Sequence, residues 1–256
     1  MTSFQGQFEN VSSATASAGV SVVIPCLNEL HHVGAVIRLL QTARSHTKTA
    51  TQIIVVDGGS DDGTLAYLQG LGDAITLLRS KPGRAVQMNA GAGRADYDTL
   101  YFVHADTRPP VTCLRDVTEA VESGHDIGGY AFSFDSPSRL LRFNSYLTGF
   151  NVLATRGGDQ SIFVRRSLFW QHGGYDPRWV IMDEYDLMRR IKAAGSDYCL
   201  LKGRTLVSDR KYRGRTWARV QIANIAAMAL WRSGAKPEAI RRRYVALLGP
   251  GEQSLR

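Results

Sequence analysis

The feature that most constrains the fold is a regular alternation between apolar, β-branched runs and segments with helical spacing. Strands are expected over residues 20–25, 52–60, 74–80 and 99–106, and helices over residues 31–44, 62–72 and 84–95. The strand segments are apolar at consecutive positions, which is typical of strands buried on both faces. Such strands in alternation with helices predict an α/β fold, with a mostly parallel central sheet flanked by helices.

Polar residues follow the expected strands at the points where the strands end. Asn28 and Glu29 follow the first strand, Asp57 and Ser60 close the second, and Asp106 closes the fourth. In an open α/β sheet, ligands bind at the edge that is formed by the carboxyl ends of the strands. The sequence therefore predicts a ligand site with carboxylates at this edge.

Composition limits the class of protein and its compartment. The 256 residues, of which 44% are hydrophobic, predict one main domain. The three cysteines lie far apart, which argues against a disulfide framework and favours a reducing cytoplasm. Residues 1–19 lack the pattern of a signal peptide and are expected to form a flexible leader. The longest nearly apolar run, 225–231, is shorter than the ~20 residues that a membrane span needs.

The C-terminal region is strongly basic and contains an apolar stretch. Residues 202–256 hold 13 Lys or Arg against 3 acidic residues, and the whole chain has a net charge of +8. The stretch 218–231 is expected to form a helix. This helix could pack on the domain, contact a second copy as a homodimer, or lie peripherally on the anionic inner membrane surface and meet a lipid acceptor there. A nucleic-acid partner is not expected, because no RRM, KH or helix-turn-helix signature accompanies the basic residues.

Common nucleotide and calcium motifs are absent from the sequence. The chain has no G-x-x-x-x-G-K-[ST], and GAGRAD (91–96) departs from G-x-G-x-x-G at its last position. In DGGSDDG, Gly59 and Asp62 stand where a calcium loop requires a ligand and a glycine. These observations argue against P-loop NTPases, dinucleotide dehydrogenases and EF-hand calcium binding.

Six motifs, in their order and spacing, closely resemble the signatures of family 2 glycosyltransferases with the GT-A fold. They are SVVIPCLNE, IIVVDGGSDDGT, GRAVQMNAGA, FVHADT, GDQSIFVRR and GGYDPRWVIMDEYDLMRRIKAAG. Within that family, HADT and GDQ are most similar to a bacterial subgroup associated with arsenosugar biosynthesis. The resemblance implies a GT-A nucleotide-sugar-binding domain over residues 20–212, followed by a helical, basic C-terminal extension over residues 213–256.

The resemblance also implies an inverting, hexosyltransferase-like enzyme. Such an enzyme moves a sugar from a nucleoside diphosphate sugar, of the UDP or GDP type, to an acceptor hydroxyl by single displacement with a carboxylate base. Two alternatives stay open. One is a sugar nucleotidyltransferase of similar architecture, although PCLNE (25–29) lacks the Gly-rich, basic loop that is usual there. The other is a non-catalytic module that binds a nucleotide sugar or a membrane surface.

Asp106 stands where the D-x-D motif of the family places its metal-binding carboxylate. A divalent cation there would stabilise the charge on the departing diphosphate, and hard carboxylate oxygens suit Mg²⁺ or Mn²⁺. His104 replaces the first acid of the motif. We interpret His104 as a supporting residue that does not bind the metal, and in that case the site should bind the cation less tightly. If the imidazole of His104 is a ligand instead, the site should favour Mn²⁺. The structural alternative for Asp106 is a cap of the turn at Pro109.

The remaining donor contacts follow from matching motif positions to the family. They are Pro25, Leu27, Asn28, Glu29, Asp57, Gly58, Arg84, Asn89 and Ala105, together with Asp106. Asp57 would accept hydrogen bonds from the base or the ribose, and Arg84 would reach the diphosphate. Each of three features also has a purely structural alternative. Asn28 could be a helix N-cap, the segment 57–63 could be a simple turn, and Asn89 could pack within its helix.

Two further pairs of residues complete the expected site. Asp159 and Gln160 correspond to a motif that faces the transferred sugar and the acceptor, with a surface loop as the alternative. Arg210 and Lys211, in the basic tail, are candidates for contacts with the diphosphate. No residue identifies the acceptor.

The general base is expected in the motif MDEYDL (182–187). Most relatives carry Glu followed by Asp there, with the second acid as the base, so matching by position points to Glu184. This sequence reverses the pair, and Asp183 is the alternative, because catalysis is sensitive to displacements of about an ångström. Acids at a helix start also complement the helix dipole, which is a structural alternative for both.

Overall fold

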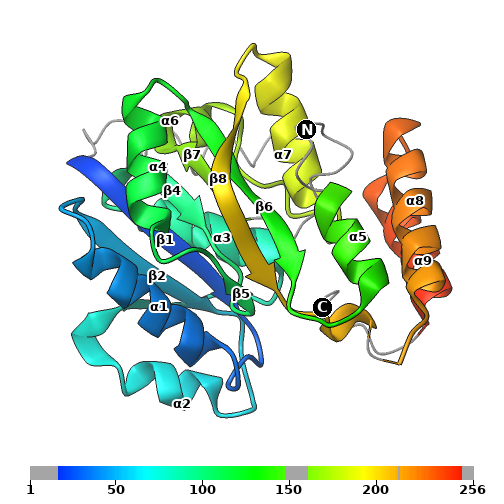
Figure 1. Cartoon of the computed structure of the whole chain (residues 1–256), viewed down its shortest axis with the longest axis horizontal. Helices are drawn as coiled ribbons and strands as arrows, with labels where there is room; N and C mark the ends of the chain where they lie inside the picture. Colours follow the sequence, from blue (N-terminus) through cyan, green and yellow to red (C-terminus); the bar gives the residue numbers. More distant parts are fainter. Residues whose placement is uncertain (1–16, 148–160, 213, 250–256) are drawn as a thin grey trace.

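The computed structural model describes residues 17–147, 161–212 and 214–249. Within this part of the chain, an eight-stranded sheet with the strand order β3-β2-β1-β4-β7-β6-β8-β5 lies at the centre (Figure 1). The strands are β1 (Ser17–Cys26), β2 (Thr51–Asp57), β3 (Thr76–Arg79), β4 (Tyr97–Phe102), β5 (Thr107–Arg108), β6 (Ile127–Phe134), β7 (Ile162–Arg165) and β8 (Tyr198–Val207).

The sheet combines a parallel half with antiparallel additions. β1 pairs in parallel with β2 and β4, β2 with β3, and β6 with β8. β7 is antiparallel to both β4 and β6, and β5 is antiparallel to β8. The predicted α/β fold with a mostly parallel sheet is therefore confirmed.

Helices flank the sheet on both faces. They are α1 (Val33–Ser45), α2 (Thr64–Gln69), α3 (Arg84–Gly93), α4 (Cys113–Glu122), α5 (Arg139–Leu147), α6 (Arg166–Gln171), α7 (Asp183–Ala193), α8 (Trp217–Arg232) and α9 (Pro237–Leu248), with short 3₁₀ turns η2 (Gly72–Ala74) and η4 (Arg210–Tyr212). None of the described helices combines the length and the apolar character of a membrane span. The cysteines Cys26, Cys113 and Cys199 are free thiols, as expected.

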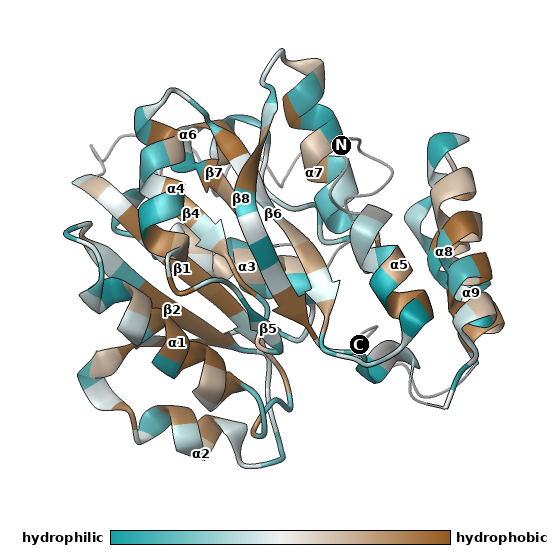
Figure 2. Ribbon diagram, in the orientation of Figure 1, coloured by the Kyte–Doolittle hydropathy of each residue, from teal (hydrophilic) through white to brown (hydrophobic). Residues whose placement is uncertain are grey.

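Two hydrophobic clusters explain why the strand sequences are apolar throughout. Val22 and Ile24 of β1 share a cluster with α1 and α4, whereas Val23 between them shares a cluster with α3, α6 and α7. Successive residues of a strand point to opposite faces, so both faces of β1 are covered by helices. The hydrophobic strands lie between these helices in Figure 2.

The C-terminal helices belong to the second of these clusters. The buried side chains of α8 are Val220, Ala223, Ala227 and Trp231, and they belong to this cluster together with Ile240, Tyr244 and Leu248 of α9. The ring of Trp231 also lies 6.0 Å from that of Tyr185 in α7. The helix predicted over 218–231 is confirmed, and packing on the domain is one of its uses. The predicted domain limits at residues 19 and 212 stay a prediction.

The fourth strand ends earlier than the sequence suggested. β4 ends at Phe102, whereas the apolar run led us to expect a strand up to Asp106. The chain turns here, because the backbone N–H of Thr107 donates to the carbonyl of His104 at 3.1 Å. His104 and Asp106 therefore lie in a turn at the edge of the sheet.

Candidate active site

Residues that are far apart in the sequence meet at the carboxyl edge of the sheet. The loops that follow β1, β2 and β4 lie next to one another, because these strands are neighbours in the order β2-β1-β4. Side-chain contacts join these loops to one another, to the first residues of α3 and α7, and to η4. Most of the residues predicted for the ligand site therefore lie at this edge of the sheet, and ligand binding there stays a prediction.

The loops after β1 and β2 are joined by a network of hydrogen bonds. Asn28, which has a left-handed backbone at φ 56°, donates its N–H to Ser60 Oγ at 2.9 Å and accepts from the N–H of Asp61 at 2.9 Å. The buried carboxylate of Asp57 accepts from the N–H groups of Gly59 at 3.0 Å and Ser60 at 3.2 Å. The turn role that the sequence left open for Asp57 is therefore present, and a contact with the donor stays a prediction.

Gln87 is a structural residue of this edge that the sequence analysis missed. Its Nε2 donates to the carbonyls of Cys26 and Val56, both at 2.8 Å, and so holds the ends of β1 and β2 together. A Cβ at Gly58 would lie 3.0 Å from the side-chain amide of Gln87, so any larger residue there would have to displace this amide. A single Gln among the apolar positions on the buried side of α3 was the available signal.

Arg210 of η4 lies between two acids of the site. Its Nη1 donates to Glu29 Oε1 at 2.7 Å, and its Nε lies 3.1 Å from Asp106 Oδ2. Glu29, which is nearly buried, also faces Nδ1 of His32 at 3.0 Å. The basic tail thus reaches the predicted metal carboxylate, whereas the side chain of Lys211 lies outside the described residues.

The two candidate bases have different partners. Asp183 accepts two hydrogen bonds from Arg84, one of them from Nε at 2.9 Å, and the pair joins the starts of α3 and α7. Glu184 Oε1 lies 3.0 Å from His104 Nε2. Both carboxylates are buried, but Oε2 of Glu184 has no hydrogen-bond partner among the described residues.

The surroundings of Glu184 favour its predicted role as the general base. Burial raises the pKa of Glu184 above its ordinary value and Asp183 adds to this, while the hydrogen bond from His104 and the charge of Arg84 oppose it. Burial lowers the pKa of His104, but the contact with Glu184 and the charge of Asp106 outweigh it, so that the net direction is upward. A carboxylate with a raised pKa holds an abstracted proton better, as general-base catalysis requires.

Other predicted residues have structural partners or lie outside the described residues. The side chain of Asn89 donates to the carbonyl of Tyr175 at 2.7 Å and accepts from its N–H at 2.9 Å, which is the packing alternative. Pro25 and Ala105 are buried and Leu27 is half-buried at the same edge. Asp159 and Gln160 fall outside the described part of the chain.

Residues 21–173 match the model of glycosyl transferase family 2, which covers more than half of the chain. The chain belongs to glycosyl transferase family 2. This glycosyltransferase is 28% identical over 193 residues to an uncharacterized glycosyltransferase of Mycobacterium tuberculosis, over 69% of this chain and 70% of that protein. It is 31% identical over 204 residues to the succinoglycan biosynthesis protein ExoA of Rhizobium meliloti, over 72% of this chain and 61% of that protein.

Solved structures confirm the fold of the glycosyltransferase. The structure of TarS of S. aureus in complex with UDP-GlcNAc matches with a TM-score of 0.60 and 14% identity, over 90% of this chain and 71% of that chain. The mannosyltransferase PcManGT of Pyrobaculum calidifontis in complex with GDP-Man and Mn²⁺ matches with a TM-score of 0.61 and 14% identity, over 95% of this chain and 76% of that chain. The chain therefore has the GT-A fold.

Proposed function

We propose that this glycosyltransferase moves a sugar from a nucleoside diphosphate sugar to an acceptor hydroxyl with inversion, in a single displacement. The observation that carries the proposal is Glu184, a buried carboxylate that contacts His104 through one oxygen and has no partner for the other among the described residues. In such a displacement, one base removes the acceptor proton while the diphosphate leaves from the opposite face of the sugar. Glu184 is preferred to Asp183, whose two oxygens are both engaged by Arg84.

The donor is proposed to be a UDP or GDP sugar of the hexose type. TarS was solved with UDP-GlcNAc and PcManGT with GDP-Man, which supports this class. The loops after β1, β2 and β4 would bind the nucleotide, and the guanidinium groups of Arg84 and Arg210 lie at this edge to balance the diphosphate charge. Asp159 and Gln160 are proposed to face the sugar and the acceptor.

A divalent cation fits this site only together with the donor diphosphate. Asp106 supplies a hard carboxylate, whereas the Nε2 of His104 is taken by Glu184. Within the described residues, no group of three or more His, Cys, Asp or Glu side chains could hold a metal ion. We therefore propose that Asp106 and the diphosphate oxygens bind Mg²⁺ or Mn²⁺ jointly, and that the cation stabilises the charge on the leaving group. The Mn²⁺ in the PcManGT complex supports this.

Removal of the proposed metal carboxylate should abolish metal-dependent nucleotide binding. Asp106→Asn is expected to bind UDP and GDP equally in Mn²⁺ and in EDTA, because the neutral amide loses the charge that attracts the cation. Calorimetric titration measures this. Asp96→Asn, at an exposed acid before the amino end of β4, is the matched control and should keep the dependence. If EDTA changes neither the nucleotide affinity nor the turnover of the wild-type enzyme, the proposed metal role is wrong.

Asp57→Ala is expected to weaken UDP or GDP binding by about 1.5–3 kcal/mol, as for a hydrogen bond to a charged group. The change removes a proposed donor contact and also the acceptor for the N–H groups of Gly59 and Ser60. Asp57→Asn, which keeps one carbonyl oxygen, should weaken nucleotide binding less than Asp57→Ala does. Unchanged nucleotide affinity in the folded alanine variant would refute the role.

The reaction class can be tested before the acceptor is known. The enzyme is incubated with UDP and GDP sugars, and NMR identifies the first anomer released by donor hydrolysis. An inverted anomer supports single displacement, and a retained anomer rejects it. Pyrophosphate release from a nucleoside triphosphate and a sugar phosphate would indicate a nucleotidyltransferase, and donor binding without turnover would indicate a binding module.

The finer assignments made from the sequence stay proposals. They are membership of the subgroup associated with arsenosugar biosynthesis, on the HADT and GDQ motifs, and a cytoplasmic location. The limits 20–212 for the GT-A domain and 213–256 for the basic extension are proposals of the same kind.

A further inference from the structure

The helices α5 and α8 expose large apolar side chains next to each other. These side chains, which we call the α5–α8 face, are Leu140, Phe143, Tyr146, Ile222 and Ile225, and each is 52% to 67% exposed. Their spacing of three residues places them on one side of each helix. The hydroxyl of Tyr212 accepts hydrogen bonds from Asn144 of α5 at 3.2 Å and from Gln221 of α8 at 3.1 Å, which holds the two helices together.

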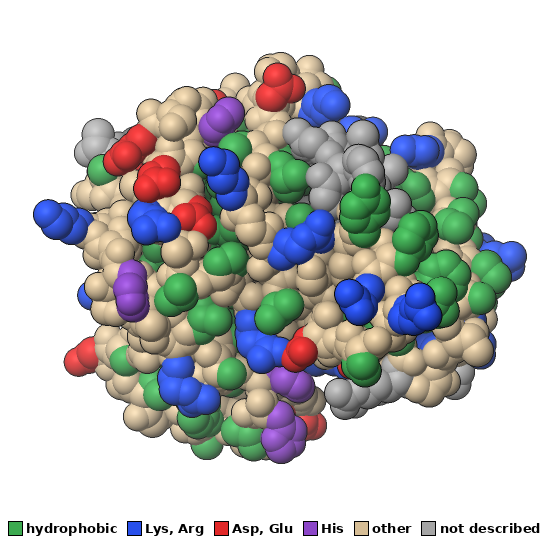
Figure 3. Space-filling view, in the orientation of Figure 1, with side chains coloured by type: hydrophobic (Ala, Val, Ile, Leu, Met, Phe, Trp, Pro, Cys, Tyr) green, Lys and Arg blue, Asp and Glu red, His purple; other side chains and the backbone are tan. Residues whose placement is uncertain are grey.

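Exposed apolar side chains gathered in one place mark an interaction surface. Figure 3 shows hydrophobic side chains over α5 and α8, with Lys and Arg side chains among them. The exposed Arg139 and Arg142 lie on α5 and Arg232 on α8, and neither helix contains an acidic residue. The face is therefore both apolar and cationic.

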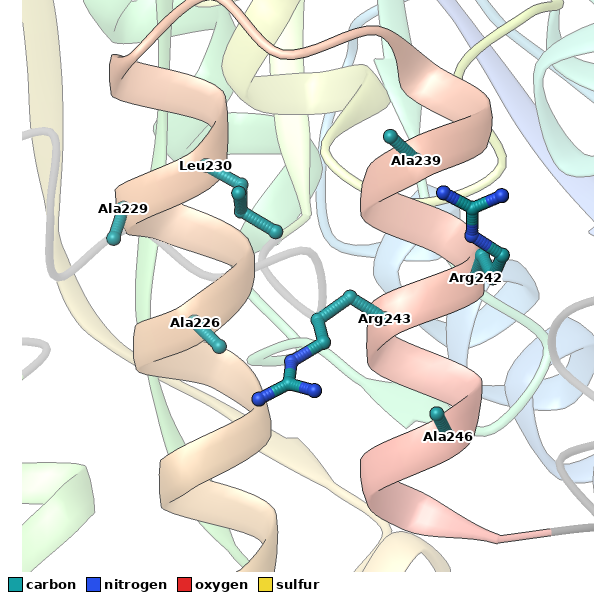
Figure 4. Close-up of a pocket in the computed structure, with 7 residues that line it drawn as sticks. All are labelled: Ala226, Ala229, Leu230, Ala239, Arg242, Arg243 and Ala246. Atoms are coloured by element: carbon teal, nitrogen blue, oxygen red, sulfur yellow. The ribbon is translucent and has the colours of Figure 1, made fainter.

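A groove between α8 and α9 continues this surface. Its volume is about 640 Å³, and its lining consists of Ala226, Ala229, Leu230, Ala239, Arg242, Arg243 and Ala246. Figure 4 shows the side chain of Arg243 extending from α9 toward α8. Alanine walls suit an acyl chain, and guanidinium groups suit a phosphate.

We infer that the α5–α8 face docks on an anionic lipid surface, and that Arg243 binds the phosphate of one lipid at the groove. Amphipathic surfaces with cations beside apolar side chains bind at the boundary between headgroups and acyl chains, and each cation adds to the attraction. A second copy of this chain is a less favourable partner for the α5–α8 face than a lipid surface. A two-fold interface places the same patch on both subunits, so arginines of one copy would face arginines of the other.

The 3₁₀ turn η4 connects this face to the candidate active site. Tyr212 holds α5 and α8, and Arg210, in the same turn, contacts Asp106 and Glu29. Docking would therefore bring the edge of the site close to the lipid surface. This last step rests on the proposed function, and it assigns the acceptor hydroxyl to a molecule that is anchored in the membrane.

Sedimentation with vesicles tests the docking directly. The full chain should bind vesicles of phosphatidylcholine mixed with phosphatidylglycerol better than vesicles of phosphatidylcholine alone, and binding should weaken as salt is added. Ile225→Glu should lower the partition coefficient by about tenfold or more, and Arg243→Ala should lower binding to the anionic vesicles. Val111→Glu, at another exposed apolar residue, and Lys48→Ala, which removes an equal charge elsewhere, are matched controls that should bind as the wild type.

Three outcomes would overturn the inference. They are no preference for anionic vesicles, equal losses in Val111→Glu and Ile225→Glu, or a dimer in light scattering that only Ile225→Glu dissociates, without vesicle binding. Circular dichroism checks that each variant is folded. Calorimetry with UDP and GDP on the same proteins separates the two proposals, since failure of nucleotide binding would reject the proposed function and leave the vesicle result standing.

Discussion

Glu184→Gln is expected to lower turnover by about 10²- to 10⁴-fold while nucleotide affinity stays nearly the same. Glutamine keeps the size of the side chain and an oxygen for the contact with His104, but it cannot accept the acceptor's proton. The measurement is kcat with an identified acceptor, or with donor hydrolysis as a substitute. UDP and GDP affinities of the same variant are measured by calorimetry.

Asp183→Asn is the matched variant at the neighbouring acid. It should lower turnover less, and it should lower the free energy of unfolding by about 1–3 kcal/mol, because it weakens the charged hydrogen bonds with Arg84. If Asp183→Asn is folded and inactive while Glu184→Gln keeps near wild-type turnover, the base is Asp183. Full activity in both variants would reject a general base in this motif.

The pH profile gives a second readout for Glu184. Burial and Asp183 raise its pKa, and His104 and Arg84 oppose this rise without cancelling it. A base works only when ionised, so kcat/KM should rise with pH through an apparent pKa above the ordinary glutamate value of about 4.3. This acid limb should be absent from the residual activity of Glu184→Gln.

His104→Asp is expected to lower turnover by about tenfold or more, although it restores the D-x-D pattern of the family. The imidazole of His104 is 3.0 Å from Glu184 Oε1, and both side chains are largely buried. A carboxylate in its place would repel Glu184 and displace it from the position that proton abstraction requires. The measurement is kcat together with the KM for the donor, and only kcat should change strongly.

His104→Gln is the conservative control, because its amide N–H can donate to Glu184 as the imidazole does. It should recover most of the activity that His104→Asp loses. Wild-type kcat in His104→Asp would show that His104 does not position the base. An equal loss in both variants would point to a need for imidazole itself.

The structure relates two departures of this sequence from the family pattern. The sequence has His104 in place of an acid and Glu184 in place of the usual Asp, and these two side chains form a hydrogen-bonded pair across 80 residues. From the sequence, the two departures were separate observations that left both the metal site and the base open. Their contact links the turn that carries the predicted metal carboxylate to the predicted base.

Some predicted donor residues have partners that the sequence did not reveal. Asp57 and Asn28 organise the loops after β1 and β2, and Asn89 binds the backbone of Tyr175. The residue types suited both binding and loop structure, because carboxylates and amides accept backbone hydrogen bonds as readily as ligand ones. Only the placement of the backbone N–H groups showed which partners are present.

The sequence by itself determined the order of strands and helices over residues 20–106, the α/β class and the edge at which the polar residues gather. These features follow from local periodicity and from the burial of both faces of a parallel sheet. Both determine which consecutive residues are apolar, so they can be read from the sequence. The partners of the site depended on the tertiary structure: Arg84 meets Asp183 across 99 residues, and Arg210 meets Glu29 across 181. Such contacts depend on how α3, α7 and η4 pack on the sheet, and no local pattern contains that information.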